Sequence, residues 1–111
     1  MKLLAAIVAG SMLMAGTARA AGKAPDRDVD LFIKIIVCES SGNHKGVWGD
    51  DGKSYGIAQF RKETFYEFAK EAGFKNFRWG NSEHQLRLLW WALRHGKAAR
   101  WSCFKKVKEK K

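Results

Sequence analysis

The chain has 111 residues, of which 46% are hydrophobic, 29% charged and 13% aromatic, and its formal net charge is +10. A chain of this length forms one small domain, which excludes a two-domain enzyme, a nucleotide-binding α/β sheet of ordinary size and a multi-helix membrane channel. Disorder is disfavoured, because disordered chains contain few aromatic residues and are weakly hydrophobic.

The first twenty residues have the pattern of a secretory signal peptide. Lys2 is followed by an apolar run over residues 3–16 and then by the small-x-small site Ala18–Arg19–Ala20, which is typical of signal cleavage. An N-terminal membrane anchor is the alternative, but the run is shorter than the roughly 20 residues that a membrane span needs. We therefore expect a periplasmic or secreted protein, with no stable membrane insertion after the signal is removed.

A first helix is predicted from a cap at Asp26 or Asp28 to the turn residues 40–43. The same run is rich in β-branched residues, so a strand is the competing prediction, although the run is long for a strand. The apolar residues that follow the three-four spacing of a buried helix face are Val29, Phe32, Ile33, Ile36 and Val37.

A glycine-rich stretch over residues 46–56 comes next. Asp51–Gly52 is its turn signal, and residues 55–60 are expected to form a short extended or single-turn piece. This part of the chain is therefore predicted to be a loop or hairpin between helices.

Two further helices are predicted. One covers residues 62–72 and stops at Gly73, and the other runs from an Asn81 cap to His95, with Gly96 at its C-terminal end. The residues expected to face inward are Phe65, Phe68 and Ala69 in the first of these helices, and Leu86, Leu89, Trp90 and Leu93 in the second.

The end of the chain is a run of lysines. We divide the sequence into a signal peptide over residues 1–20, a domain over residues 21–104 and a basic tail over residues 105–111. Such a tail is expected to be solvated. In an exported protein, nucleic acid is not the expected partner, and anionic envelope polymers or lipid head groups fit the charge better. A membrane-active cationic protein is a further alternative, and this tail is the only feature that favours it.

The chain has two cysteines, Cys38 and Cys103. In an oxidising compartment an even number of cysteines predicts a disulfide, and only one pairing exists within the chain. Closing so long a loop is worth roughly 4 kcal/mol in the chain-entropy model. A metal site would need His44, His84 or His95, and none has zinc-site spacing to either cysteine. We expect no metal and no cofactor.

Glu39 is the candidate catalytic residue, because stability alone would not favour a carboxylate there. It lies at the C-terminal end of the first predicted helix, where the macrodipole disfavours a negative charge by roughly 0.3–1 kcal/mol. It also follows the apolar residues 35–38, so partial burial should raise its pKa. A carboxylic acid that stays protonated near neutral pH suits general-acid cleavage of a glycosidic bond. The alternative is a solvent-facing glutamate at a helix end.

Glu39–Ser40 belongs to a longer ordered pattern. The segment WGDDGKSYGIAQF follows over residues 48–60, with Gln59 twenty residues after the glutamate. This pattern resembles the Glu-Ser and Gly-Leu-Met-Gln motifs of bacterial lytic transglycosylases and goose-type lysozymes, both of the lysozyme-like superfamily. Residues 81–96 are similar to the helix that follows in transglycosylases, with Gln85 where Asn is usual. The resemblance covers about residues 29–96.

The resemblance implies a small, mostly α-helical lysozyme-like domain that cleaves peptidoglycan. In the family the glutamate protonates the oxygen between N-acetylmuramic acid and N-acetylglucosamine, and in lytic transglycosylases it then takes a proton from the sugar's own 6-hydroxyl to give a 1,6-anhydro product. We expect this reaction for Glu39, with a glycan strand as partner and a monomeric enzyme. A hydrolytic muramidase and a non-catalytic peptidoglycan-binding module of the same fold are the alternatives.

Hydrolysis would require a second carboxylate to hold water, about 6.5–9.5 Å away in an inverting enzyme. Asp50 is the candidate, because the goose-type pattern has Asp there, and turn formation in a glycine-rich loop is the alternative role. The resemblance also implies substrate contacts. The expected substrate-binding residues are Ser54, Tyr55, Gln59 and, as an aromatic platform for a sugar ring, Trp48.

The chain also departs from the family. Residues 101–104 stand where transglycosylases often have an Ala-Tyr-Asn-x-Gly segment that closes the cleft, and Ala58 replaces the usual Met before Gln59. We therefore expect a shallow cleft with few sugar subsites.

Overall fold

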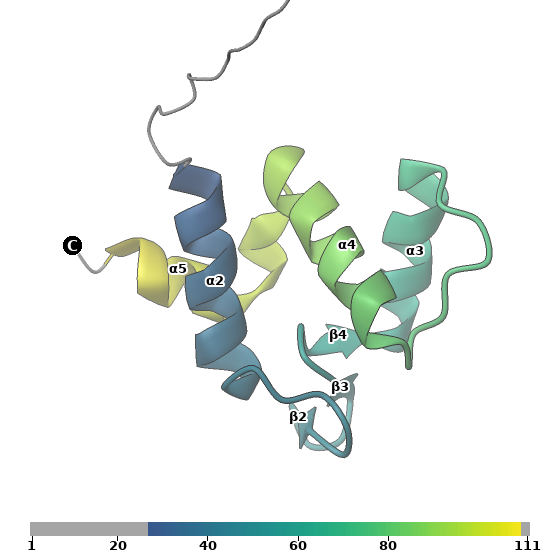
Figure 1. Cartoon of the computed structure of the whole chain (residues 1–111), viewed down its shortest axis with the longest axis horizontal. Coiled ribbons are helices and arrows are strands. Elements are labelled where there is room, and N and C mark those ends of the chain that lie inside the picture. Colours follow the sequence, from purple (N-terminus) through teal and green to yellow (C-terminus); the bar gives the residue numbers. More distant parts are fainter. Residues whose placement is uncertain (1–26, 110–111) are drawn as a thin grey trace, which may run out of the picture. The chain divides into compact units, whose positions relative to one another are not determined.

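The computed structural model describes residues 27–109 (Figure 1), so the predicted signal peptide and the possible cap at Asp26 lie outside the described residues. The chain divides between Asp30 and Leu31, and the core and the candidate site lie in residues 31–109. The elements are α2 (Arg27–Ser40), β2 (Trp48–Gly49), β3 (Ser54–Tyr55), β4 (Phe60–Arg61), α3 (Lys62–Ala72), α4 (Ser82–Arg94), the 3₁₀ turn η3 (Ala98–Arg100) and α5 (Ser102–Glu109). The described chain is therefore mostly helical with a small sheet, as predicted.

Helix α3 has the predicted bounds and the predicted buried face. Phe65, Phe68 and Ala69 are buried. Gly73 ends the helix in the left-handed conformation, at φ 77°, and its N–H bonds back to the carbonyl of Lys70. Glycine adopts this conformation without the steric cost that a Cβ adds.

Helix α4 packs beside α3 (Figure 1) and begins as predicted. The side chain of Asn81 accepts a hydrogen bond from the N–H of His84 at 2.9 Å, which satisfies one of the free N–H groups of the first turn. Leu89 and Leu93 are buried as expected, whereas Leu86 and Trp90 are only half-buried. The inward face of α4 is completed by Gln85, Leu88 and Ala92.

The segment α2 is a helix rather than a strand, and its predicted buried face is only partly right, because Phe32 and Ile36 pack against the core while Val29 is 43% exposed. Ile33 and Val37 are 53% and 59% exposed, whereas Ile35 is fully buried. Apolar residues at positions 33, 35, 36 and 37 surround the helix, so periodicity alone did not select the side that packs. The helix begins at Arg27, which places Asp28 in the first turn rather than at the cap.

Helix α5 contains several of the lysines that the sequence assigned to a tail, since it extends to Glu109. Phe104 and Val107 on this helix are half-buried and pack against the core, while Lys105 and Lys106 are exposed. The predicted disulfide is confirmed. Cys103 in α5 is bonded to Cys38 in α2, with Cα atoms 5.9 Å apart and a sequence separation of 65.

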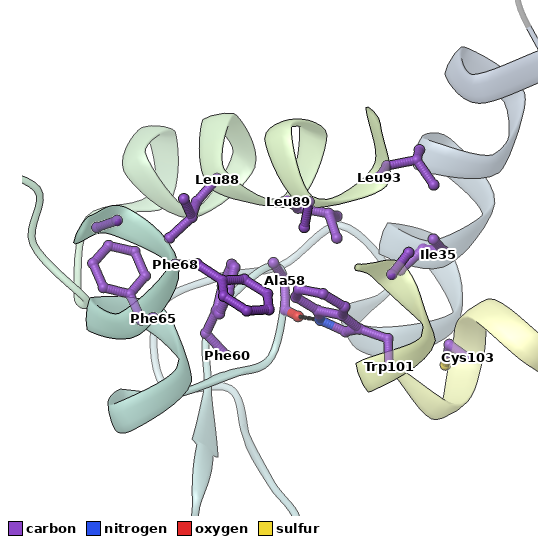
Figure 2. Close-up of a cluster of buried hydrophobic side chains, with 13 residues drawn as sticks. Ile35, Ala58, Phe60, Phe65, Phe68, Leu88, Leu89, Leu93, Trp101 and Cys103 are labelled. Carbon is purple, nitrogen blue, oxygen red and sulfur yellow. Dashed lines mark hydrogen bonds between the residues drawn. The ribbon is translucent and has the colours of Figure 1, made fainter. Parts of the chain in front are cut away.

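The core contains side chains from every helix and from the segment between β3 and β4 (Figure 2). Trp101 packs edge-on against Phe60, with ring centroids 4.9 Å apart, and its Nε1 donates to the carbonyl of Ala58 at 2.7 Å (Figure 2). Aromatic pairs in this geometry stabilise a core beyond the area they bury. None of the described helices has the length and hydropathy needed to cross a bilayer.

Candidate functional site

The register of the small sheet separates the predicted site residues into two groups. Gly49 pairs with Ser54, and Ser54 pairs with Arg61, whereas Trp48 pairs with Tyr55. Directly paired residues of antiparallel strands point to the same face, and successive residues along a strand point to opposite faces. Ser54 and Arg61 therefore share a face that Trp48 and Tyr55 do not.

A cavity of about 650 Å³ lies against the first of these faces. Its volume falls within the range of roughly 300–1,000 Å³ that is usual for small-molecule sites. Four of the six predicted catalytic and substrate-binding residues line it: Glu39, Asp50, Ser54 and Gln59. The rest of the wall is formed by Gly49, Phe60, Arg61, Thr64, Arg100, Trp101, Ser102, Cys103 and Lys106.

Glu39 is half-buried at the end of α2. Burial raises the pKa of Glu39, a backbone hydrogen bond from Cys103 opposes the rise, the negative charge of Asp50 adds to it and the positive charge of Lys106 opposes it. Burial disfavours the charged form of a carboxyl group. At a given pH, the Glu39 carboxyl group is therefore protonated to a greater extent in the fold than in free solution. This agrees with the direction that the sequence predicted.

Asp50 is an exposed carboxylate held by three hydrogen bonds to one oxygen. Arg61 donates to its Oδ2 from Nε at 3.2 Å and from Nη2 at 3.0 Å, and the hydroxyl of Ser54 donates at 3.2 Å. The hydrogen bonds from Arg61 and Ser54 lower the pKa of Asp50. The residue also lies in the left-handed region, at φ 59°. Asp50 thus faces the cavity and forms the turn at the same time.

Gln59 adopts the left-handed conformation as well, at φ 52°, which is costly for a residue with a side chain. Its Nε2 donates to the carbonyls of Val47 and Gly56, each at 3.0 Å. Its Oε1 lies so close to Gly49 that a Cβ at that position would collide with it. Gly49 is therefore required for the position of the Gln59 carboxamide.

Two side chains near the end of α2 hold the segment that carries Gln59. The hydroxyl of Ser40 donates to the carbonyl of Ile57 at 2.7 Å. Nδ1 of His44 accepts from the N–H of Ile57 at 2.9 Å, so its Nε2 carries the proton and donates to the carbonyl of Gly80 at 2.8 Å. Ile57 is therefore fixed on both sides of its backbone.

Gln85 fixes the same segment from α4, and sequence reasoning assigned it no role. It is fully buried. Its Oε1 accepts from the N–H of Ala58 at 3.0 Å, and its Nε2 donates to the carbonyls of Tyr55 and Trp79, each at 2.8 Å. The available signal was a polar residue among the leucines of an amphipathic helix, since buried polar groups are nearly always paired.

Trp48 and Tyr55 belong to a different feature, which we call the outer aromatic cluster: His44, Trp48, Tyr55 and Trp79. The centroids of Trp48 and Tyr55 are 4.6 Å apart, and Trp79 lies about 6 Å from both. Trp48 is 55% exposed. Neither Trp48 nor Tyr55 lines the cavity, so the structure does not bring these two predicted substrate-binding residues to Glu39.

Three cations of the cavity wall were missed by sequence reasoning. Arg61 comes from β4, Arg100 from η3 and Lys106 from α5. Each is one basic residue among many in the sequence, and only the packing of three separate elements brings them together. No local pattern could have selected them.

The arrangement presents a partly buried carboxylic acid, an ionised carboxylate and three cations around one cavity. Within residues 27–109, no group of three or more His, Cys, Asp and Glu side chains is placed to hold a metal ion. No family model, curated protein or solved structure matches the chain.

Proposed function

We propose that the protein is an exported enzyme of the lysozyme-like type that cleaves the glycan strand of peptidoglycan, acting as a lytic transglycosylase with Glu39 as its single acid. The observation that carries the proposal is the pairing of Glu39, whose pKa is raised, with Asp50, whose pKa is lowered, around one cavity. Carboxyl groups whose environments move their pKa values apart are typical of glycosidase sites. The resemblance of residues 39–59 to the family motifs supports the same reaction.

In the proposed reaction, Glu39 donates its proton to the glycosidic oxygen as the bond from that oxygen to C1 of the muramic acid breaks. The ionised Glu39 then accepts the proton of the 6-hydroxyl of the same sugar, while O6 forms a bond to C1. The product carries a 1,6-anhydro ring, and Glu39 is protonated again. One residue acts first as acid and then as base, so no second proton carrier is needed.

Asp50 fits a supporting role in this reaction. A carboxylate that is bonded to Arg61 and Ser54 and has a lowered pKa is a weak base, so it is poorly suited to activating water. Because Arg61 offsets its negative charge, Asp50 contributes only modestly to stabilising positive charge that develops on the sugar ring. This favours the transglycosylase over the hydrolytic muramidase, which stays the alternative reaction.

The proposed location is the periplasm or the cell exterior, because of the signal peptide pattern. The confirmed disulfide fits an oxidising compartment. Removal of residues 1–20, which carry Lys2 and Arg19, lowers the net charge from +10 to +8, and this charge favours association with an anionic wall polymer.

Digestion of purified sacculi tests the proposal. The wild-type protein should release soluble muropeptides, and mass spectrometry should find mostly 1,6-anhydro ends. Products that carry reducing ends instead of anhydro ends would show that the enzyme is a hydrolytic muramidase and not a transglycosylase. If the protein binds sacculi but releases no muropeptides, both proposed enzyme activities are wrong.

A non-catalytic peptidoglycan-binding module is the second candidate. The observation that favours it is that both carboxylates have structural partners: Glu39 accepts from the backbone of Cys103 in the first turn of α5, and Asp50 is paired with Arg61. A carboxylate at a helix N-terminus is stabilising in its own right. Under this candidate, sacculi are bound and not cleaved.

A further inference from the structure

We propose that Lys106 is a specificity-determining residue of the cavity, and that it binds a carboxylate of the glycan beside the bond that Glu39 cleaves. This inference rests on the proposed function and specifies that the substrate carries a negative charge beside the cleaved bond. It starts from the composition of the cavity wall, to which three separate elements contribute one cation each.

Two of the three cations already have anionic partners. Arg61 is paired with Asp50 at 3.0 Å. Arg100 is paired with Glu67 at 3.2 Å and lies over the ring of Phe68, with its guanidinium carbon 5.1 Å from the ring centroid. These contacts offset both arginine charges and hold Arg61 against the turn after β2 and Arg100 against α3.

Lys106 differs from the two arginines. It forms no ion pair with any side chain that the structure describes, and the cavity carboxyl group with which it interacts is Glu39. The working form of Glu39 is the protonated acid, which carries no charge. In that form Lys106 is a surplus positive charge on the wall beside the catalytic group.

A muramic-acid glycan supplies the matching charge. Each muramic acid carries a lactyl group whose carboxylate is either free or joined to a stem peptide, and the peptide has carboxylates of its own. A lysine ammonium is a compact charge on a flexible stem, so its chemistry suits either carboxylate. A chitin oligosaccharide has the same backbone bond and neither carboxylate, which makes it the neutral comparison.

The experiment measures equilibrium binding of three soluble glycans of equal length: a peptide-free muramic glycan, a peptide-bearing muramic glycan and a chitin oligosaccharide. The protein carries Glu39→Gln throughout, which keeps the acid position neutral, prevents cleavage and removes any effect of Lys106 on the pKa of Glu39. Lys106→Gln is added to test the residue. Lys105→Gln is the matched control, because it removes the same charge from the neighbouring exposed position of α5, outside the cavity.

Lys106→Gln should weaken binding of at least one muramic glycan about three- to fivefold and leave binding of chitin unchanged, while Lys105→Gln should change neither. A loss confined to the peptide-free glycan identifies the lactyl carboxylate, and a loss confined to the peptide-bearing glycan identifies the stem peptide. Equal effects of the two lysine variants, or an equal loss with chitin, would overturn the inference.

The result is independent of the catalytic claim. The protein could prefer muramic glycans through Lys106 and yet fail to cleave sacculi. That result would refute the proposed enzymatic activity and support the carboxylate-binding site. Cleavage of sacculi without that preference would retain the enzyme and refute the role of Lys106.

Discussion

Glu39 is subject to two opposing effects. Burial disfavours its charged form, while the N–H of Cys103 favours it, and burial is the larger effect because the pKa is raised. A carboxyl group whose pKa is higher in the folded state stabilises the fold below its unfolded pKa, and that contribution is lost as the pH rises through the folded pKa. The ionised fraction of Glu39, which grows as the pH rises through the folded pKa, therefore lowers the free energy of unfolding.

Replacing Glu39 with Gln should accordingly raise the thermal midpoint near pH 7, because the neutral amide keeps an acceptor for Cys103 and carries no charge to bury. The difference from wild type should shrink at about pH 4, where the carboxyl group is largely protonated. Thermal unfolding followed by circular dichroism at the two pH values measures this. Glu63→Gln, at an exposed position in the first turn of α3, should give no such gain. A Glu39→Gln protein less stable than wild type near pH 7 would contradict the account.

The role of Asp50 determines the reaction type. Because its side chain is bonded to Arg61 and Ser54, we expect Asp50→Asn to reduce cleavage less than about tenfold, with 1,6-anhydro ends still dominant by mass spectrometry. Asn also tolerates the left-handed backbone there. Asp51→Asn is the control, since Asp51 has the same φ of 59° and lies outside the cavity wall. A loss of more than a hundredfold that is specific to Asp50, together with mostly reducing ends, would show that Asp50 holds an attacking water.

The carboxylates and Gln59 of this site were predictable from sequence because they fall within one short ordered motif. Arg61, Arg100 and Lys106 were not, because their proximity depends on how β4, η3 and α5 pack. The placement of Trp48 and Tyr55 away from the cavity also required the sheet register, since a one-residue shift in register moves a side chain to the opposite face.

At the scale of elements, the segment between β3 and β4 is held by hydrogen bonds from several parts of the fold. Ser40, His44, Gln85 and Trp101 all bond to its backbone. These bonds keep Gln59 in its left-handed conformation at the cavity. Ser40, His44 and Gln85 do not line the cavity, so its geometry depends in part on side chains outside its wall, of which Gln85 makes the most bonds.

Gln85→Leu should leave the N–H of Ala58 and the carbonyls of Tyr55 and Trp79 without this partner. The bond to Ala58 is buried and the other two are partly buried. An unpaired buried group costs about 1–3 kcal/mol, so we expect a loss of at least about 1 kcal/mol and a thermal midpoint lower by about 4 °C or more. Cleavage of sacculi should fall even at temperatures where the variant is folded. Arg87→Leu is the control, because it introduces leucine on the exposed side of α4 and should have little effect. Equal stability of the two variants would contradict this role of Gln85.

Helix boundaries were predictable where the chain has explicit end signals. Gly73, Asn81 and Gly96 mark three ends of α3 and α4, and those predictions agree with the structure within about a residue. The buried face of α2 was only partly predictable, because its apolar residues do not favour one side: Phe32 and Ile36 pack as expected, but the fully buried residue is Ile35. Helix α5 was missed because three of its eight residues are lysines that resemble a solvated tail, and because its position depends on the distant Cys38.

At the scale of the whole molecule, one wall of the cavity comes from the end of the chain, and the disulfide joins that end to α2. Cys38→Ala with Cys103→Ala should lower the free energy of unfolding by about 4 kcal/mol, the chain-entropy value for so long a loop. That is a large share of the 5–15 kcal/mol typical of a domain. Urea unfolding measures the loss.

The same double variant should lose cleavage at temperatures where it remains folded, because Trp101, Ser102 and Lys106 are no longer tied beside Glu39. The contrary result would be a free energy of unfolding within about 1 kcal/mol of wild type, or cleavage of sacculi at the wild-type rate. Either result would show that packing alone positions α5.

The central claim is that Glu39 is the acid that cleaves a glycan. The most direct measurement is the initial rate of muropeptide release from purified sacculi by wild type, Glu39→Gln and the control Glu63→Gln, after circular dichroism and thiol titration show that all three are folded with the disulfide intact. General-acid catalysis contributes about a hundredfold or more, so Glu39→Gln should retain at most about 1% of the wild-type rate while Glu63→Gln stays near it. A Glu39→Gln protein that keeps more than about a tenth of the wild-type rate would place the acid elsewhere and contradict the account.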